Sequence, residues 1–234
     1  MKLHAPEIPK KYRPEGIDLI HEDLDLIIGN KAAGYLTVAA RWNRDKTIHS
    51  ALNEYIRKGN SRSKKSLFVV HRLDQATSGV LIFAKSEEAQ QALKNNWGNT
   101  IKTYYAIVHG HLSKKSGIIE SYLEEDEDYF VKSTSDANSG KLAKTQYKVV
   151  QEVERYSLLK INLLTGKKNQ IRVHLSEQGH PIVGDSKYGN KSGGGKFLLL
   201  HSHAIEFDHP HSKKRITAVA PVPEYFKKVI NFDY

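Results

Sequence analysis

The stretch "FVVHRLDQATSGVLIFAK", residues 68–85, places charged side chains between two apolar runs. The runs at its two ends have the composition of buried strands, and Arg72 and Asp74 lie between them, two positions apart. Charged groups in such a place must either lie at a solvated turn or be paired. Turn-forming residues 75–79 follow, so we expect Asp74 at the end of a strand, on a rigid sheet. On this stretch alone, a structural and a functional role for Asp74 are equally open.

The segments on either side of this stretch predict both strands and helices. Apolar or alternating runs predict strands at 25–28, 35–38, 102–110, 143–152, 156–164, 197–200, 204–207 and 215–220. Helical spacing and capping residues predict helices at 47–58, 86–97, 169–178 and 224–230. In the third helix, Asn169 is the expected cap and Gly179 the expected stop. We therefore expect an α+β fold on a mixed, largely antiparallel central sheet with flanking helices.

Length and composition limit the domain organisation and the compartment. Of 234 residues, 39% are hydrophobic, which suffices for one domain at 19–234 after a basic, proline-containing extension at 1–18. No apolar run approaches the roughly 20 residues of a membrane span, and the first residues contain no apolar signal core. No cysteine is present, which excludes disulfides, thiolate nucleophiles and cysteine-bound zinc. We expect a cytoplasmic protein with no membrane partner.

The charge balance favours a polyanionic partner. Lysine and arginine number 36 against 26 acidic residues, a net charge of +10. Five cations fall in residues 57–65 with no acid between them: Arg57, Lys58, Arg62, Lys64 and Lys65. Glycine and serine make this segment a mobile loop able to follow a phosphate backbone. The acidic run 124–128 is interpreted as a solvated loop that points away from such a ligand. A basic surface without a partner is the alternative.

Two other candidate sites fit their chemistry poorly. The glycine-rich segment 189–197 lacks two requirements of a phosphate-binding loop, because Asn190 and Phe197 stand where glycine and serine or threonine are needed. We interpret it as a surface loop. A histidine cluster is the second candidate, since His201 and His203 alternate along a strand and His209 and His211 follow. No carboxylate spacing completes a ligand set, although Asp208 is close, and no metal site is expected.

Several motifs occur in an order that matches one enzyme family. Three of them carry the comparison: "HRLDQATSG" at 71–79, "KTYYA" at 102–106 and "LTGKKNQIRVH" at 164–174. Shorter similarities lie at 30–34, 180–185, 198–201 and 220–221. Together they resemble the signatures of the RluA family of RNA pseudouridine synthases over roughly residues 20–225. The resemblance implies the pseudouridine synthase catalytic fold and isomerisation of uridine to pseudouridine in RNA.

The third motif departs from the family at two positions. Lys167 stands where the family usually has arginine, and lysine keeps the charge but loses the two-pronged geometry. Asn169 stands where it usually has histidine, and asparagine keeps hydrogen bonding and capping but cannot titrate. These changes bear on substrate contacts more than on catalysis, because Arg172 is retained.

The resemblance implies a role for each catalytic residue. Asp74 would attack C1′ or take the 2′ proton, and so must be ionised. Arg172 resembles the arginine that pairs with this aspartate and would hold it charged, aided by the positive end of the helix near residue 169. Tyr104 would stack on the uracil and help remove the C5 proton. The reaction is redox-neutral, so no cofactor is expected.

RNA recognition is expected to use Arg72 together with the cationic loop. Arg72 matches the family arginine that fills the space left by the extruded uridine. We expect Arg72 and Asp74 to point the same way from one strand, whereas His71 points oppositely and is structural. Further RNA contacts are expected from Lys102, Lys167 and Asn169.

The implied substrate is a short stem-loop of ribosomal RNA (23S) or transfer RNA. The chain resembles compact family members without the additional N-terminal RNA-binding (S4) domain, and we expect a monomer. Two functions from other classes stay open. One is a catalytically inactive RNA-binding or RNA-folding factor, and the other is a histidine-ligated, metal-dependent RNA hydrolase.

Overall fold

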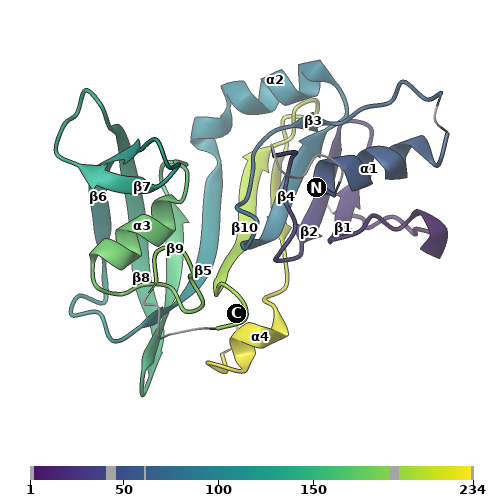
Figure 1. Ribbon diagram of the computed structural model, residues 1–234. Coiled ribbons are helices and arrows are strands. Elements are labelled where there is room, and N and C mark those ends of the chain that lie inside the picture. The colour runs from purple at the N-terminus through teal and green to yellow at the C-terminus, as the bar shows by residue number, and fades with distance from the viewer. Residues whose placement is uncertain (1–2, 41–45, 61, 190–194, 233–234) are drawn as a thin grey trace. The chain divides into compact units, whose positions relative to one another are not determined.

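The computed structural model describes residues 3–40, 46–60, 62–189 and 195–232 (Figure 1). The chain divides into two units. The first unit comprises residues 1–100 and 202–221, and the second comprises residues 101–201 and 222–234. Among the helices of the described residues, none has the length and apolar character that crossing a membrane requires.

The first unit is built on antiparallel strands around an entirely buried one. The strand order is β1 (Ile17–Glu22), β2 (Leu26–Lys31), β4 (Ser78–Ala84) and β10 (Leu200–Asp208), with β3 (Phe68–Val69) beside β4 and β11 (Arg215–Val219) beside β10. Every residue of β4 is buried, because the strand has neighbours on both edges and packed side chains on its faces. The short β3 leads into the segment that contains Arg72 and Asp74, and β4 follows it. The segment is therefore held at both ends by the core.

The two helices of the first unit both begin after a capping side chain. In α1 (Ile48–Arg57), Thr47 and Ser50 form a reciprocal capping box. In α2 (Glu87–Asn95), the Ser86 hydroxyl accepts the Ala89 N–H at 3.1 Å. Short 3₁₀ turns lie at η1 (Lys10–Tyr12) and η2 (Trp97–Asn99). The predicted helices at 47–58 and 86–97 are confirmed, with α2 ending slightly earlier than expected.

An apolar cluster of buried residues forms part of the core of the first unit. It is contributed by β2, β4, α2, β10 and β11, and its members include Leu26, Ile28, Val80, Ile82, Leu93, Ile205 and Phe207. Gly79 opens β4 with a φ of +117°, and a Cβ there would lie 2.1 Å from the carbonyl oxygen of Ser202. Only glycine allows β4 and β10 to approach this closely.

The second unit carries its own antiparallel sheet. Its strand order is β5 (Ile101–His109), β9 (Tyr156–Leu163), β8 (Lys141–Val153), β6 (Ser116–Glu125) and β7 (Val131–Thr134). Helix α3 (Gln170–Glu177) lies across β6, β7 and β8 (green in Figure 1). The short α4 (Glu224–Lys227) follows Pro223. The predicted α+β class with a mostly antiparallel sheet is confirmed, and one catalytic domain over 19–234 stays a prediction.

Residues 35–38 are not the predicted strand. The segment makes only one isolated bridge, from Leu36 to Thr47. Its carbonyls are used elsewhere, because the N–H groups of Ile48 and His49 donate to Leu36 and Thr37 at 2.9 and 3.0 Å. The segment whose apolar alternation predicted a strand therefore provides carbonyl groups that accept the first N–H groups of α1.

Three strands were not expected. β1 begins at Ile17, and β6 and β7 are rich in polar and charged residues, so neither formed an apolar run. β6 extends to Glu125, so the acidic run 124–128 is a loop only in its second part. Cross-strand pairing stabilises these strands: β1 pairs with β2, β7 pairs with β6, and β6 also pairs with β8. The two strands predicted at 197–200 and 204–207 are instead one strand, β10, which starts at Leu200, and α4 stops at Lys227 instead of 230.

Candidate active site

The Asp74 segment is a loop fastened on both sides. Contrary to expectation, residues 70–77 form no strand, so Arg72 and Asp74 do not project from one. On one side of Asp74, the Thr37 hydroxyl donates to the Leu73 carbonyl at 2.8 Å. On the other, Gly34 and Gln75 exchange two hydrogen bonds, at 2.8 and 2.9 Å. Gly34 and Thr37, the second of which belongs to the predicted strand 35–38, instead hold the backbone that carries Asp74.

The side chains around Asp74 alternate between exposed and buried, as expected, although the segment is not a strand. Arg72 is exposed, Leu73 is buried and Asp74 is half-buried. His71 accepts the Ile82 N–H at its Nε2, 3.2 Å away, and its ring lies 5.1 Å from that of Trp97. The expected structural role of His71 is supported by these contacts.

Lys31 is a fully buried cation beside the Asp74 segment. Its Nζ donates to the carbonyls of Ala32, Tyr35 and Gln75 at 2.9, 2.9 and 3.0 Å. Three carbonyls match the three N–H donors of an ammonium group. Burial lowers the pKa of Lys31 to about 7, and the charge of Asp74 opposes that shift. Lys31 thus joins the turn after β2 to the residue that follows Asp74.

Arg172 in the second unit forms a two-pronged ion pair. Its Nε and Nη2 donate to the two carboxylate oxygens of Asp185, each at 2.8 Å. Asp185 also accepts the N–H groups of Lys187 and Tyr188, both at 2.9 Å. Burial alone would raise the pKa of Asp185, but the hydrogen bonds and the charge of Arg172 outweigh it and hold the pKa below its ordinary value. The pair uses two of the five N–H donors of Arg172, so it is compatible with a second carboxylate partner.

Tyr104 and Arg172 are both largely buried in the second unit. Tyr104 is 7% exposed in β5, opposite Ile161 of β9, and Arg172 is 8% exposed in α3. The guanidinium of Arg172 lies 5.1 Å from the ring centre of Tyr188. Asp74 belongs to the first unit, so its expected pairing with Arg172 and its proximity to Tyr104 stay predictions.

The predicted cap of α3 is wrong. Asn169 has the left-handed conformation, with φ of 52°, and its side chain makes no capping hydrogen bond. Its Oδ1 instead accepts the Tyr188 hydroxyl at 3.2 Å. The side chain of Gln170 accepts the Lys167 N–H at 3.0 Å and so closes the loop before the helix. Asparagine tolerates this backbone region better than most residues do. The predicted stop is confirmed, because Gly179 has a φ of +80°.

The expected RNA contacts differ in how much surface they offer. Arg62, Lys64 and Lys65 are exposed, and Arg57 and Lys65 are tied together where the Arg57 Nε donates to the Lys65 carbonyl at 2.9 Å. Lys58 is exposed and ends α1 in the left-handed conformation. In contrast, Lys102 is 9% exposed, and burial lowers its pKa. Lys167 is half-buried and Asn169 is 9% exposed, so the loop is the more accessible of the two groups.

The histidines that the sequence offered as metal ligands, His201, His203, His209 and His211, have other partners. His203 bonds the Ala220 carbonyl through Nδ1 at 3.0 Å, and His201 packs edge-on against Phe226. In the described part of the chain, the group placed closely enough to hold a metal ion is Asp23, Asp25 and His209. Residues 190–194 of the glycine-rich candidate lie outside the described ranges.

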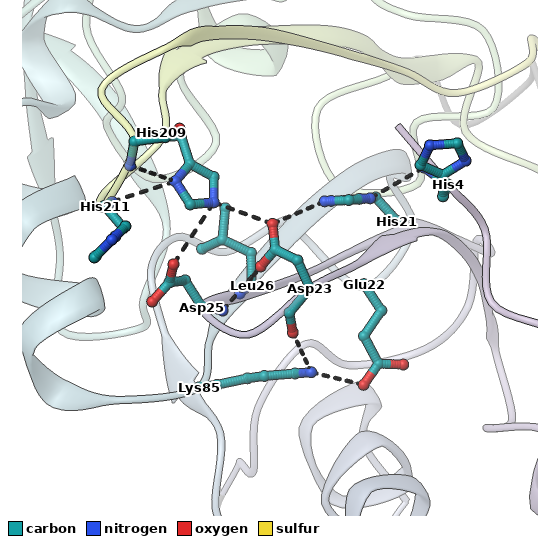
Figure 2. Close-up of polar contacts among 10 residues, drawn as sticks. His4, His21, Glu22, Asp23, Asp25, Leu26, Lys85, His209 and His211 are labelled. Carbon is teal, nitrogen blue, oxygen red and sulfur yellow. Dashed lines mark hydrogen bonds and ion pairs between the residues drawn. The ribbon is translucent and has the colours of Figure 1, made fainter. Parts of the chain in front are cut away.

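Hydrogen bonding in the Asp23 group opposes metal binding. The His209 Nδ1 accepts the N–H groups of His211 and Ser212, so its proton resides on Nε2, which donates to Asp23 at 3.0 Å (Figure 2). His21 is arranged alike, with Nδ1 accepting from His4 and Nε2 donating to Asp23 at 2.9 Å. A metal at these Nε2 atoms would have to displace both protons. The group is better described as a structural network that joins β1, the β1–β2 turn and the β10–β11 turn.

Sequence reasoning assigned no role to Lys31 or Asp185. Both lie in short stretches, 30–34 and 180–185, that matched the family, and this match was the available signal. A lysine at the end of the buried strand β2 was a second signal, since a charge there must find partners. Their partners, Gln75 and Arg172, lie 44 and 13 residues away in the sequence.

Comparison with known proteins agrees with the fold and with these motifs. The family model described as RNA pseudouridylate synthase matches residues 25–177. The chain is 32% identical over 93% of its length to the uncharacterized RNA pseudouridine synthase YlyB of Bacillus subtilis, of which it covers 73%. It is 30% identical over 92% of its length to tRNA pseudouridine synthase C of Haemophilus ducreyi, of which it covers 95%. Human RNA pseudouridylate synthase domain containing 4 has a similar fold, with a TM-score of 0.73 at 22% identity and 89% of each chain covered.

The fold and the motifs define an RNA-modifying isomerase. The chain belongs to the RNA pseudouridylate synthase family and is of the RluA type, whose members act on uridines in RNA.

Proposed function

We propose that this chain converts specific uridines to pseudouridine in a stem-loop of ribosomal or transfer RNA. Two relatives point to these substrates. One is ribosomal large subunit pseudouridine synthase D of Borreliella burgdorferi, 36% identical over 84% of this chain, and the other is the transfer RNA enzyme of Haemophilus ducreyi. The net charge of +10 and the exposed cations at 57–65 suit either RNA.

Asp74 is the proposed nucleophile or base. The observation that carries this role is that hydrogen bonds hold its loop on both sides, to Thr37 and to Gly34, with the cation of Lys31 alongside. A carboxylate in a fixed loop, half-buried and next to a buried positive charge, meets the needs of attack on C1′.

The bonds exchanged define the remaining roles. The C1′–N1 bond breaks, the uracil turns, a C1′–C5 bond forms, and the C5 proton is lost while N1 gains one. Tyr104 stacks on the uracil, and its phenol assists removal of the C5 proton. Arg172 holds Asp74 ionised, and Asp185 fixes the guanidinium of Arg172 in one orientation. The exchange is redox-neutral, so the mechanism requires no metal or organic cofactor.

Recognition of the RNA divides between a stacking residue and phosphate contacts. Arg72 is exposed two residues before Asp74, where its planar guanidinium can occupy the space left by an extruded uridine. The phosphate backbone is bound by the cations of the loop after α1, namely Arg57, Lys58, Arg62, Lys64 and Lys65. Lys167 and Asn169 make further contacts with the RNA. Lys102 is largely buried in the same strand as Tyr104, so a role in supporting Tyr104 suits it better than a contact with phosphate.

The test is release of tritium from RNA labelled at C5 of uridine. Incubation with transcripts of ribosomal and transfer RNA should release tritium while the strand remains intact. Strand scission would indicate a hydrolase instead, and binding without either result would indicate an inactive RNA-binding factor. Mapping of the modified position would then identify the RNA.

A further inference from the structure

A cavity of about 570 Å³ lies in the first unit beside α1. Its walls are the N-terminal segment 11–15, Tyr35, and residues of α1 and of the turns at its two ends. The volume falls within the range of about 300–1,000 Å³ that is usual for small-ligand sites. None of the candidate catalytic residues lines it.

Four cations face this cavity against two carboxylates. The cations are Lys11, Arg13, Lys46 and Arg57, and the carboxylates are Glu15 and Glu54. Glu15 is engaged by the Tyr35 hydroxyl at 2.9 Å. The balance is therefore positive, and cations in this arrangement attract a phosphate group.

The N-terminus of α1 does not supply the anion site. The N–H groups of Ile48 and His49 donate to the carbonyls of Leu36 and Thr37, and that of Ser50 donates to Thr47. An anion in the cavity must therefore be held by side chains.

Three tyrosines supply flat apolar surface beside the cations. The ring of Tyr35 packs on Gly16, where an added Cβ would lie 2.6 Å from two of its ring atoms, and its hydroxyl is bound by Glu15. The hydroxyl of Tyr55 donates to Glu22 at 2.5 Å. Tyr12 lies beneath the Nζ of Lys11, 4.7 Å from its ring centre. Rings fixed in this way lose little conformational entropy when a base stacks on them.

Tyr35 links the cavity to the Asp74 segment. Lys31 donates both to the carbonyl of Tyr35, which lines the cavity, and to that of Gln75, which follows Asp74. Gly34, next to Tyr35, also pairs with Gln75. An RNA strand that delivers a uridine to Asp74 therefore passes close to this cavity.

We propose that the cavity binds an unstacked nucleotide of the same RNA that carries the target uridine. The phosphate contacts Lys11 and Arg13, and the base stacks on Tyr12 or Tyr35. Cations interleaved with aromatic rings are the recognition chemistry of single-stranded nucleic acid. This inference rests on the proposed function, because it places the same RNA strand at Asp74.

Two double variants test the phosphate contacts. Lys11→Gln with Arg13→Gln removes two exposed cations of the cavity, and Lys148→Gln with Lys160→Gln removes two exposed, cross-strand lysines of the second unit as a matched control. Binding is measured by fluorescence anisotropy with a labelled oligouridylate of about eight nucleotides. We expect the cavity variant to bind roughly fivefold more weakly and to lose up to about 1.4 units of salt slope, with little change in the control. Equal losses of affinity in both variants would show that the overall charge alone determines binding, and would overturn the proposal.

Photocrosslinking locates the base. An oligouridylate that carries 4-thiouridine should crosslink to Tyr12 or Tyr35, and the crosslink should weaken in the cavity variant. Crosslinks that map entirely outside residues 11–15 and 35 would overturn the proposal. Competition by free UMP as strong as that by the oligonucleotide would also overturn it, because the cavity would then serve a free nucleotide.

Failure of the proposed function is scored separately, by tritium release from wild-type protein. Absence of tritium release with the crosslink retained would reject the isomerase function and leave an RNA-binding cavity. Tritium release with an unchanged affinity and crosslink pattern in the Lys11→Gln, Arg13→Gln variant would reject the cavity alone.

Discussion

Among the single residues, Lys31 is the buried cation whose partners all belong to the loops that carry the candidate chemistry. Three carbonyls bind its Nζ, and Asp74 contributes a favourable charge. The position was visible in the sequence as a lysine after an apolar strand, but its partners were not. Gln75 lies 44 residues away, and only the folded β2–β4 pairing places it against Lys31.

Lys31→Met should lower the free energy of unfolding by roughly 2–4 kcal/mol, because three carbonyls lose their donor. The difference from wild type should also depend on pH. The pKa of Lys31 is about 7 when folded against 10.5 ordinarily, so the unfolded chain binds more protons between these values. The wild-type advantage over Met should therefore be constant below pH 7 and should rise from pH 7 to 9, by up to about 1.4 kcal/mol per unit. Urea unfolding at pH 6, 7, 8 and 9 measures it, and a pH-independent difference would contradict the account.

Asp185 should be equally sensitive to loss of its charge. Asp185→Asn leaves the buried guanidinium of Arg172 with an uncharged neighbour, and we expect a loss of about 3–5 kcal/mol in unfolding free energy. Glu154→Gln is the matched control, since its pair with Arg155 is exposed at 3.7 Å and should contribute less than about 1 kcal/mol. Similar losses for the two variants in urea unfolding would show that the buried Arg172–Asp185 pair stabilises the protein no more than an exposed ion pair does.

Among the elements, the start of β4 depends on a glycine. Gly79→Ala would place a Cβ 2.1 Å from the Ser202 carbonyl at a φ of +117°, so β4 and β10 would have to separate. We expect a loss of at least about 3 kcal/mol in unfolding free energy. Gly98→Ala is the control, because its added Cβ meets nothing within 4 Å, and it should change stability by less than about 1 kcal/mol. Equal thermal and urea midpoints for the two variants would disprove this packing.

The elements also show which features a sequence can predict. Helix α1 was predicted from the helical spacing of its apolar residues, and α2 from Ser86, which caps it through a neighbour three residues away. Strand β4 was predicted because burial on both faces requires an unbroken apolar run. Strands β6 and β7 were missed, since polar and charged residues interrupt their apolar pattern and pairing with each other and with β8 stabilises them.

In the candidate site, too, some features could be predicted from the sequence and others could not. The family motifs identified Asp74, Tyr104 and Arg172, but local pattern placed Arg72 and Asp74 on a strand that does not form. That error has a physical cause. Alternating burial at Arg72, Leu73 and Asp74 arises in a loop fastened by Thr37 and Gln75, and alternation alone does not distinguish a strand from such a loop.

For the whole molecule, the excess of positive charge should appear as salt-dependent RNA binding. Lys64→Gln with Lys65→Gln removes two exposed cations from the loop after α1, and should weaken binding to target and non-target stem-loops alike. The slope of log affinity against log salt should become shallower by up to about 1.8 units. Fluorescence anisotropy between 50 and 200 mM salt measures both effects. A loss confined to the target RNA would mean that these lysines read sequence or shape instead.

The central claim is that Asp74 is the catalytic carboxylate of an RNA uridine isomerase. Asp74→Asn keeps the size and hydrogen bonding of the side chain but removes the nucleophile or base, whereas Asp18→Asn neutralises an exposed carboxylate of the same unit. The decisive measurement is single-turnover tritium release from C5-labelled RNA by wild type and both variants, with RNA affinity measured in parallel. We predict that Asp74→Asn slows release at least about a thousandfold while its affinity stays within a few-fold, and that Asp18→Asn matches wild type. Turnover by purified Asp74→Asn protein at a rate close to that of wild type would contradict the account.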